Sequence, residues 1–228
     1  VEMLALKTLI TRERFELVID LQGLFKSGAI TFFSRAPQRV GFANSRELSY
    51  LSYNQRIKLL PGRMHAVDRY LYLVNTLVGQ DWTQPSFILP NFPGKGQFIK
   101  EILASHKIDD QRPIIAICPS ARWQSKRWPV ERFGELIGKL CAEGCQVLIV
   151  GGEADRLLGD KLLASVSSSG VVSIAGETDL IQLAAVMEKV NLLVTNDTGP
   201  MHLAAAVGTP VVAIFGPTDP ELTGPYGQ

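Results

Sequence analysis

The second half of the chain alternates short apolar runs with stretches of helical periodicity. The runs rich in Val, Ile and Leu at residues 114–118, 146–150, 171–174, 191–195 and 210–215 have the length of buried strands. Between them, apolar residues recur at helical spacing in residues 129–142, 153–166, 180–188 and 202–207. Strands that alternate with helices in this way predict a parallel sheet with helices on both faces.

The first half carries a weaker version of the same alternation. We expect strands at residues 15–19, 39–42 and 55–59 and an extended piece at 86–89, where three prolines lie close by. Helical spacing predicts helices at residues 24–34, 65–78 and 98–105, with a further helix starting near residues 45–48. These elements predict a second α/β domain.

The polar, unpatterned residues 109–113 are the most linker-like point in the sequence. We therefore expect an N-terminal domain at 1–108 and a C-terminal domain at 109–228, with a cleft between them. The sequence opens inside a helical pattern and stops in a loop after a glycine-rich segment. Because a doubly wound domain normally begins on a strand, we expect that the first domain is incomplete and that one or both ends are missing.

Composition narrows the class of protein. The chain has 228 residues, 46% hydrophobic content and a formal net charge of +1, which disfavours nucleic acid as a partner. No apolar run reaches about 18 residues and no signal-peptide pattern is present, so we expect a cytoplasmic protein. Cys118, Cys141 and Cys145 fit no common zinc pattern, and we expect them to be reduced, mostly buried thiols.

Residues 190–220 are the stretch around which the chain is organised. The sequence NDTGP lies between an expected strand and an alanine-rich helix, so a loop opens there into a helix N-terminus, where anions bind. Asp197 is either a helix cap or a group that faces neutral hydroxyls, such as those of a sugar. His202, in the first helical turn, is either structural or a ligand contact. The pattern predicts a site for a phosphorylated ligand.

Two further loops follow strands of the same sheet. Residues 118–129 hold three cations between two tryptophans, and Lys126 with Arg122 suggests a diphosphate clamp; the alternative is a solvated basic loop. In Gly151-Gly152-Glu153 the carboxylate suggests a ribose contact; the alternative is a turn with a glutamate that stabilises its helix. GxGxxG is absent, which disfavours a dehydrogenase, and no DxD, HExxH or CxxC supports a metal site.

These residues resemble those of the ADP-heptose:lipopolysaccharide heptosyltransferases, glycosyltransferase family 9. The resemblance covers nearly the whole chain and is most specific in NDTGPMHLAAAVGTPVV and FGPTDP, while ARWQSKRWP is similar to the family's phosphate loop. FELVIDLQGLFKSG, RELSYLSYN and HAVDRY resemble heptosyltransferase I more than heptosyltransferase II. The resemblance implies the GT-B fold, in which two Rossmann-like domains face a cleft, here with an incomplete N-terminal domain.

The resemblance also implies how a donor, ADP-heptose, would be held. Lys126 would bind the diphosphate and stabilise the leaving group, with Ser120 and Arg122 beside it. Glu153 would hold the ribose, and the loop at Thr178 would receive the adenine. No cofactor is implied, because the sugar nucleotide is itself the substrate.

At the other end of the donor, the resemblance implies that Asp197 binds heptose hydroxyls. The backbone amides of Thr198 and Gly199, together with His202, would complete the phosphate site. The implied reaction is an inverting, metal-independent transfer of heptose.

The implied acceptor is Kdo-bearing lipid A or the inner core of lipopolysaccharide, which is anionic. The first-half cations Lys26, Arg35, Arg46 and Arg69 are therefore candidate acceptor contacts, although the pattern around them is also typical of solvated helix faces. A lipid acceptor implies peripheral contact with the inner face of the inner membrane.

The sequence departs from the family pattern at its beginning. The family's N-terminal strand and glycine-aspartate loop, which supply its proposed catalytic base, have no match here, and neither does its C-terminal helix. If these are the natural ends, we expect little or no transferase activity. Two alternatives stay open: a GT-B-type sugar-nucleotide epimerase, which needs no acceptor, and a non-catalytic module that binds nucleotide sugars.

Overall fold

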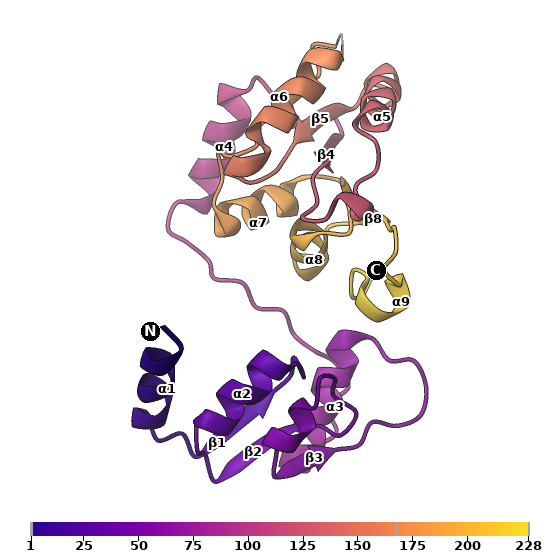
Figure 1. Cartoon of the computed structure of the whole chain (residues 1–228). Helices are drawn as coiled ribbons and strands as arrows, with labels where there is room; N and C mark the ends of the chain where they lie inside the picture. The colour runs from indigo at the N-terminus through magenta and orange to yellow at the C-terminus, as the bar shows by residue number, and fades with distance from the viewer. Residues whose placement is uncertain (1, 167, 228) are drawn as a thin grey trace. The chain divides into compact units, whose positions relative to one another are not determined.

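The chain folds into two compact units, Val1–Pro85 (unit 1) and Ser86–Gln228 (unit 2), in a computed structural model that describes residues 2–166 and 168–227 (Figure 1). Each unit is built on one parallel sheet with helices packed against it. The predicted α/β class is therefore confirmed. The helices and strands that are described agree closely with those expected from the hydrophobic pattern.

Unit 1 has a three-stranded parallel sheet in the order β1-β2-β3. Its elements are α1 (Glu2–Arg12), β1 (Leu17–Asp20), α2 (Phe25–Phe33), β2 (Gln38–Phe42), the 3₁₀ turn η1 (Ser49–Ser52), β3 (Gln55–Ile57) and α3 (Ala66–Val78). The helix expected to start near residues 45–48 is instead the short turn η1.

The core of unit 1 is small and is supported by the buried hydrogen bond from the Tyr53 hydroxyl to Asp20. Val40, Phe42, Ile57 and Leu73 form the apolar cluster between the sheet and α3. Beside it, a Cβ atom added at Gly41 would lie 2.3 Å from the ring of Tyr53, so only glycine lets this ring lie against β2.

Unit 2 has a five-stranded parallel sheet in the order β6-β5-β4-β7-β8, so the chain winds out from β4 in both directions. Its elements are α4 (Lys95–Ser105), β4 (Ile114–Cys118), the turn η2 (Gln124–Lys126), α5 (Val130–Ala142), β5 (Gln146–Ile149), the turn η3 (Glu153–Asp155), α6 (Arg156–Ser165), β6 (Val171–Ser173), α7 (Leu180–Lys189), β7 (Leu192–Asn196), α8 (Gly199–Ala206), β8 (Val211–Ile214) and α9 (Pro220–Thr223).

The two faces of this sheet bury two separate apolar clusters. Because side chains alternate along a strand, Ile115 and Ile117 of β4 pack with α5 and α6, while Ile114 and Ala116 pack with α4, α7 and α8. Strands β4, β5 and β7 are almost wholly buried, as in other sheets covered by helices, whereas the edge strand β8 is partly exposed. In the central strands this double cover leaves the strand ends as the accessible part.

The boundary between the units differs from the expected one at residues 108 and 109. Helix α4 belongs to unit 2, because Leu103 is buried in the cluster that contains α7 and Phe98, Ile99 and Ile102 pack against it. The polar residues 109–112 are not a linker either. Asp109 hydrogen-bonds the side chain of Gln146, and the Arg112 guanidinium donates to the carbonyl of Gly144.

Candidate functional site

The carboxyl edge of the unit 2 sheet gathers the predicted loops. All five strands are parallel, so the loops that follow β4, β5, β6, β7 and β8 open at the same edge. The structure thus brings together the three loops identified from the sequence. The same edge carries the loop at Thr178, which follows β6, and residues 215–219 of the FGPTDP motif, which follow β8.

The loop between β4 and α5 (residues 119–129, the lysine loop) is held at both ends by one side chain. Asn196, at the end of β7, is fully buried; its side-chain oxygen accepts from the Trp128 amide over 2.9 Å and its side-chain nitrogen donates to the Pro119 carbonyl over 2.8 Å. Arg127 adds a bond to the Ala121 carbonyl at 2.7 Å. The loop is therefore fixed to the strand that leads into α8.

The two tryptophans of the lysine loop have different surroundings. Trp128 packs edge-on against Phe133, which is in the core, with the ring centres 5.0 Å apart. Trp123 is 61% exposed, and the Arg122 guanidinium lies 5.6 Å from its ring. Ser120 is buried and its hydroxyl lies 3.8 Å from the Cys118 sulfur, so it does not face solvent in this state.

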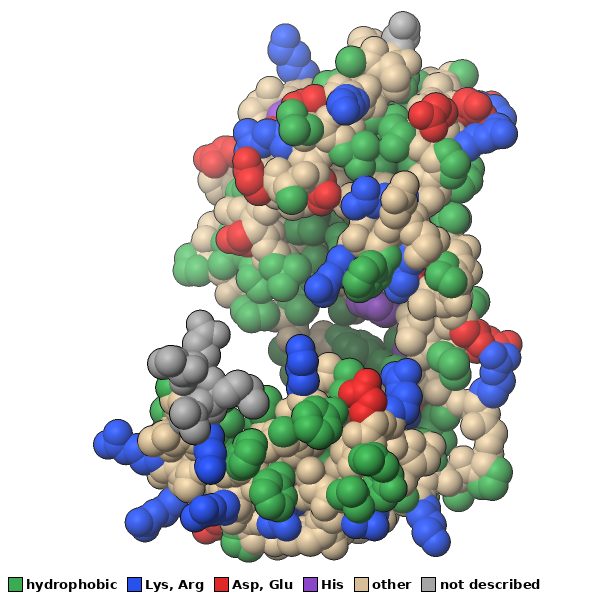
Figure 2. All heavy atoms as spheres, in the orientation of Figure 1, with side chains coloured by type: hydrophobic (Ala, Val, Ile, Leu, Met, Phe, Trp, Pro, Cys, Tyr) green, Lys and Arg blue, Asp and Glu red, His purple; other side chains and the backbone are tan. Residues whose placement is uncertain are grey.

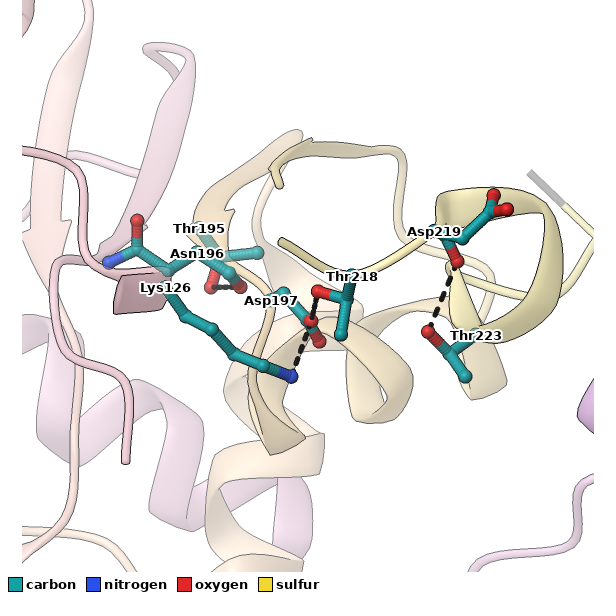
Figure 3. Close-up of polar contacts among 7 residues, drawn as sticks. All are labelled: Lys126, Thr195, Asn196, Asp197, Thr218, Asp219 and Thr223. Atoms are coloured by element: carbon teal, nitrogen blue, oxygen red, sulfur yellow. Dashed lines mark hydrogen bonds and ion pairs between the residues drawn. The ribbon is translucent and has the colours of Figure 1, made fainter. Parts of the chain in front are cut away.

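Lys126 and Asp197, assigned to different parts of the ligand from the sequence, form an ion pair. The Lys126 ammonium lies 2.6 Å from the Oδ2 atom of Asp197, and the hydroxyl of Thr218 donates to the same oxygen (Figure 3). Burial alone would raise the pKa of Asp197. The hydrogen bonds from Lys126 and Thr218 and the positive charges of Lys126 and His202 outweigh burial and hold that pKa below its usual value.

The N-terminus of α8 lies directly after this carboxylate. Thr198 is the N-cap residue with extended backbone (φ −154°, ψ 171°), and Gly199 starts the helix, three residues earlier than the sequence pattern predicts. His202 is exposed in the first turn. Amide groups at a helix N-terminus and the positive end of its dipole favour an anion there.

Glu153, the expected ribose contact, forms an ion pair with Arg156 at 2.8 Å, at the start of α6. Arg156 also donates to the carbonyl of Gly176, which has a left-handed backbone (φ +79°). A Cβ atom added at Gly176 would lie 2.7 Å from a carboxylate oxygen of Glu153, so glycine also leaves room for the Glu153 side chain. Glu153 is nevertheless well exposed at the carboxyl edge, and a side chain paired at the surface is readily redirected.

The expected adenine loop, residues 174–179, is held by neighbours on both sides. Glu177 contacts the His106 ring at 2.8 Å, and Asp179 caps α7 by accepting from the amide of Gln182. Thr178 lies between these two anchors, half-buried.

Three contributors were missed by sequence reasoning: Asn196, Thr218 and Arg156. Asn196 and Thr218 lie inside the motifs NDTGP and FGPTDP, but their partners are far away in the sequence; Thr218 and Asp197 are 21 residues apart, and Asn196 and Trp128 are 68 apart. The motifs point to Asn196 and Thr218, but spacing in the sequence does not show which distant residues they contact.

The candidate acceptor cations of unit 1 do not all lie together. Lys26 is in the first turn of α2 and Arg46 follows β2, and the Arg46 amide donates to the Gly23 carbonyl; both are at the carboxyl edge of the first sheet. The Arg69 guanidinium lies 4.0 Å from the ring of Phe42, which ends β2. Arg35 follows the other end of α2, so it lies at the opposite edge of the sheet.

Unit 1 carries an excess of positive charge. Residues 1–85 contain 11 Lys and Arg against 7 Asp and Glu, a formal charge of +4, while the rest of the chain is net acidic. Figure 2 shows the same contrast: basic side chains predominate on the visible face of the part that contains α1 to α3, and both signs are interspersed on the other part. A basic surface attracts anionic ligands.

Further features of the described residues bear on the chemistry. Burial raises the pKa of the Cys118 thiol, which therefore stays protonated, and Cys118, Cys141 and Cys145 are all free. Within residues 2–166 and 168–227, we find no helix that is both long and apolar enough to cross a membrane. The same residues contain no cluster of three or more His, Cys, Asp or Glu side chains that could hold a metal ion.

The sequence matches the family description "Glycosyltransferase family 9 (heptosyltransferase)" over residues 3–228. It is 31% identical over 225 residues to lipopolysaccharide heptosyltransferase 2 of Salmonella typhimurium, covering 95% of this chain and 64% of that protein. It is also 31% identical over 217 residues to lipopolysaccharide heptosyltransferase 1 of Pseudomonas aeruginosa, covering 94% and 58%. The chain thus spans less than two thirds of the length of these relatives.

Among solved structures, E. coli heptosyltransferase WaaC with ADP superposes on 99% of this chain and 68% of its own, with a TM-score of 0.74 and 27% identity. This likeness confirms the GT-B fold class. The relatives named heptosyltransferase 1 and 2 match at the same 31% identity, so the expected closeness to type I stays a prediction.

Proposed function

The chain belongs to glycosyltransferase family 9, the heptosyltransferase family, and on that premise we propose that unit 2 binds ADP-heptose as the donor of a heptosyl transfer. The observation that carries this proposal is the juxtaposition of Lys126, Asp197 and the N-terminus of α8 at one edge of the sheet. A cation and a helix N-terminus together suit a diphosphate, and a carboxylate beside them suits sugar hydroxyls.

The same groups would stabilise the leaving group. As the bond to the anomeric carbon breaks, negative charge develops on the β-phosphate of ADP. Lys126, once it turns from Asp197 to the diphosphate, and the amides of Thr198 and Gly199 would oppose that charge, with His202 beside them. We propose that the transfer is inverting and metal-independent, with positive charge supplied by these groups.

The remaining donor contacts follow from the neighbouring loops. Glu153 would accept from the ribose hydroxyls after turning away from Arg156, and the loop at Thr178 would receive the adenine. Arg122 and Ser120 lie on the lysine loop and would flank the diphosphate. These roles rest on the loops' common position at the carboxyl edge, where ligands bind in such folds.

For the acceptor we propose Kdo-bearing lipid A or the inner core of lipopolysaccharide. Lys26, Arg46 and Arg69 are the favoured contacts, because they cluster at the carboxyl edge of the basic unit 1; Arg35 is the least favoured of the four cations. A lipid-linked acceptor would place the protein in the cytoplasm, in peripheral contact with the inner membrane. No described residue is assigned the role of the base that takes the acceptor proton.

Calorimetric titration with ADP tests donor binding. Replacing Lys126 with Ala should weaken ADP binding about 10- to 100-fold, as expected for the loss of a charge-assisted hydrogen bond. Lys139→Ala, which removes an exposed lysine from the last turn of α5, is the matched control and should leave affinity unchanged. Equal ADP affinity in wild type and Lys126→Ala would count against the proposal.

Product analysis separates the alternatives. With ADP-heptose and a Kdo-lipid A acceptor, a transferase releases ADP only when the acceptor is present. An epimerase would release free sugar from the donor alone. ADP binding without turnover under either condition would identify a non-catalytic nucleotide-sugar-binding module.

A further inference from the structure

The loop after β8 contributes to the candidate site through Thr218, to which neither the sequence motifs nor the proposed function assigns a role. Its hydroxyl donates to Oδ2 of Asp197, the same oxygen that lies 2.6 Å from the Lys126 ammonium (Figure 3). Three loops, after β4, β7 and β8, therefore meet on one carboxylate oxygen. This contact gives the FGPTDP motif a position in the site.

The backbone of the same loop is docked against the lysine loop. A Cβ atom added at Gly216 would lie only 2.4 Å from the carbonyl oxygen of Ser125, the residue before Lys126. The Asp197 amide donates to the carbonyl of Ile214 over 3.1 Å, which continues the pairing of β7 with β8. These backbone contacts fix the position of the loop that carries Thr218 relative to both Asp197 and Lys126.

The Asp197 carboxylate depends on its partners. Its side chain is only 7% exposed, and a buried carboxylate is costly unless it is paired and hydrogen-bonded. A bound diphosphate would compete with Asp197 for the Lys126 ammonium. When Lys126 turns toward phosphate, Asp197 loses its ion pair at the moment when more negative charge arrives nearby.

Thr218 can fill that need because its hydroxyl is neutral and does not compete for the lysine. We propose that Thr218 is a positioning residue: it keeps Asp197 ionised and oriented while Lys126 exchanges from Asp197 to the donor diphosphate. This inference rests on the proposed function, since it concerns the same donor site. Thr218 acts through Asp197 and need not touch the donor.

The exchange of Lys126 from Asp197 to the diphosphate predicts opposite changes in ADP affinity for substitutions at Thr218 and Asp197. Thr218→Val removes the hydroxyl at nearly constant volume, so Asp197 holds Lys126 more strongly and ADP binding should weaken about fivefold. Asp197→Asn removes the competing charge, so ADP binding should strengthen about fivefold. Thr218→Ser keeps a hydroxyl and should restore affinity to within twofold of wild type.

A double-substitution cycle provides the decisive measurement. If Thr218 acts through the Asp197 charge, Thr218→Val should leave ADP affinity unchanged in the Asp197→Asn background. A Thr218 that merely supports the fold would weaken binding in both backgrounds, and that result would overturn the inference. Thr223→Val is the matched control, because Thr223 is exposed on α9 and its hydroxyl donates to the carbonyl of Asp219 (Figure 3).

Calorimetry on the wild-type chain and Lys126→Ala distinguishes this inference from the proposed function. If ADP binds wild type and loses affinity in Lys126→Ala, but Thr218→Val binds like wild type, only the role of Thr218 fails. If ADP does not bind wild type, or binds Lys126→Ala equally well, the donor site itself is wrong. Thermal unfolding of Thr218→Val and Thr218→Ser checks that both variants are folded.

Discussion

The backbone amide of Trp128 donates a hydrogen bond of 2.9 Å to the side-chain oxygen of Asn196. The side-chain nitrogen of Asn196 meanwhile donates to the carbonyl of Pro119, at the other end of the lysine loop. A single buried amide therefore satisfies one donor and one acceptor from a loop that has no strand or long helix to pair them. This arrangement fixes the lysine loop relative to β7.

Replacing Asn196 with Ala should loosen the lysine loop. The buried Pro119 carbonyl and the partly buried Trp128 amide would lose their partner, which costs about 2–4 kcal/mol of stability in unit 2 and should weaken ADP binding about tenfold. Thermal unfolding, calorimetry and amide hydrogen exchange at Trp128 measure these effects. The exchange of the Trp128 amide should accelerate markedly, and an unchanged rate would show that the bond does not hold the loop.

Asn54 offers a matched control for this substitution. Its side chain also bridges two backbone groups, accepting from the Arg39 amide and donating to the Pro37 carbonyl, but these bonds are exposed. Water can replace an exposed partner, so Asn54→Ala should cost no more than about 1 kcal/mol. It should leave ADP affinity unchanged.

Replacing Gly216 with Ala should disturb the site by steric displacement alone. The added methyl carbon would lie 2.4 Å from the Ser125 carbonyl oxygen, so one of the two loops must move. Overpacking of this kind costs about 1–3 kcal/mol, and the shift should weaken ADP binding several-fold. Thermal unfolding and calorimetry test both effects.

Gly138→Ala is the contrasting substitution. Gly138 is inside α5 and, apart from the local backbone of the helix, no heavy atom lies within 4 Å of the added carbon, so alanine should be neutral or stabilising by about 0.5–1 kcal/mol. A Gly216→Ala variant as stable as Gly138→Ala, with wild-type ADP affinity, would show that the close approach to Ser125 has no functional effect.

The fold was largely readable from the sequence because its signals are local. The strands β4, β5, β7 and β8 are short runs of β-branched residues between helices of clear period, so their existence and parallel arrangement follow from pattern alone. The unit boundary did not follow, because the affiliation of α4 depends on which core Leu103 enters. That choice is a tertiary contact, and no local signal records it.

The site was readable as a set of loops but not as a set of contacts. The spacing places Lys126 and Asp197 at the same sheet edge, yet it assigns one to phosphate and the other to sugar, because the two are 71 residues apart and their ion pair is invisible in the sequence. Composition alone does not show where Arg35 lies. It is basic and near Lys26 in sequence, but α2 carries it to the opposite edge of the sheet.

Replacing Tyr53 with Phe should destabilise unit 1. The Tyr53 hydroxyl donates to Oδ2 of the buried Asp20 over 2.6 Å, while Oδ1 accepts from the amides of Gln22 and Gly23. A buried carboxylate that loses a hydrogen bond costs about 1–3 kcal/mol. Urea unfolding of unit 1 tests this, with Tyr50→Phe as the control, because the Tyr50 ring lies instead beside the Arg56 guanidinium.

The same contact predicts an alkaline limit to stability. Burial, and then the hydrogen bond to Asp20, raise the pKa of Tyr53 above its ordinary 10.0. A group whose pKa is raised by folding contributes stability that is present below its unfolded pKa and is lost as pH rises toward the folded value. Ultraviolet titration of the phenols should show Tyr53 ionising last among those that titrate in the folded state, and ionisation together with the others would contradict the buried pair.

The Asp197 carboxylate predicts an acid limit in unit 2. Burial would raise its pKa, but the hydrogen bonds from Lys126 and Thr218, with the charges of Lys126 and His202, hold it below the ordinary 3.8. Because the unfolded chain then binds the proton more readily, the stabilisation is present above the unfolded pKa and is lost as pH falls through the folded one.

The Asp197→Asn variant lacks this carboxylate. The difference in melting temperature between wild type and Asp197→Asn should therefore be largest near neutral pH and shrink below about pH 4. Asp160→Asn, at an exposed position of α6, controls for the change in net charge. A difference that stays constant down to pH 3 would show that Asp197 is not held by its cationic neighbours.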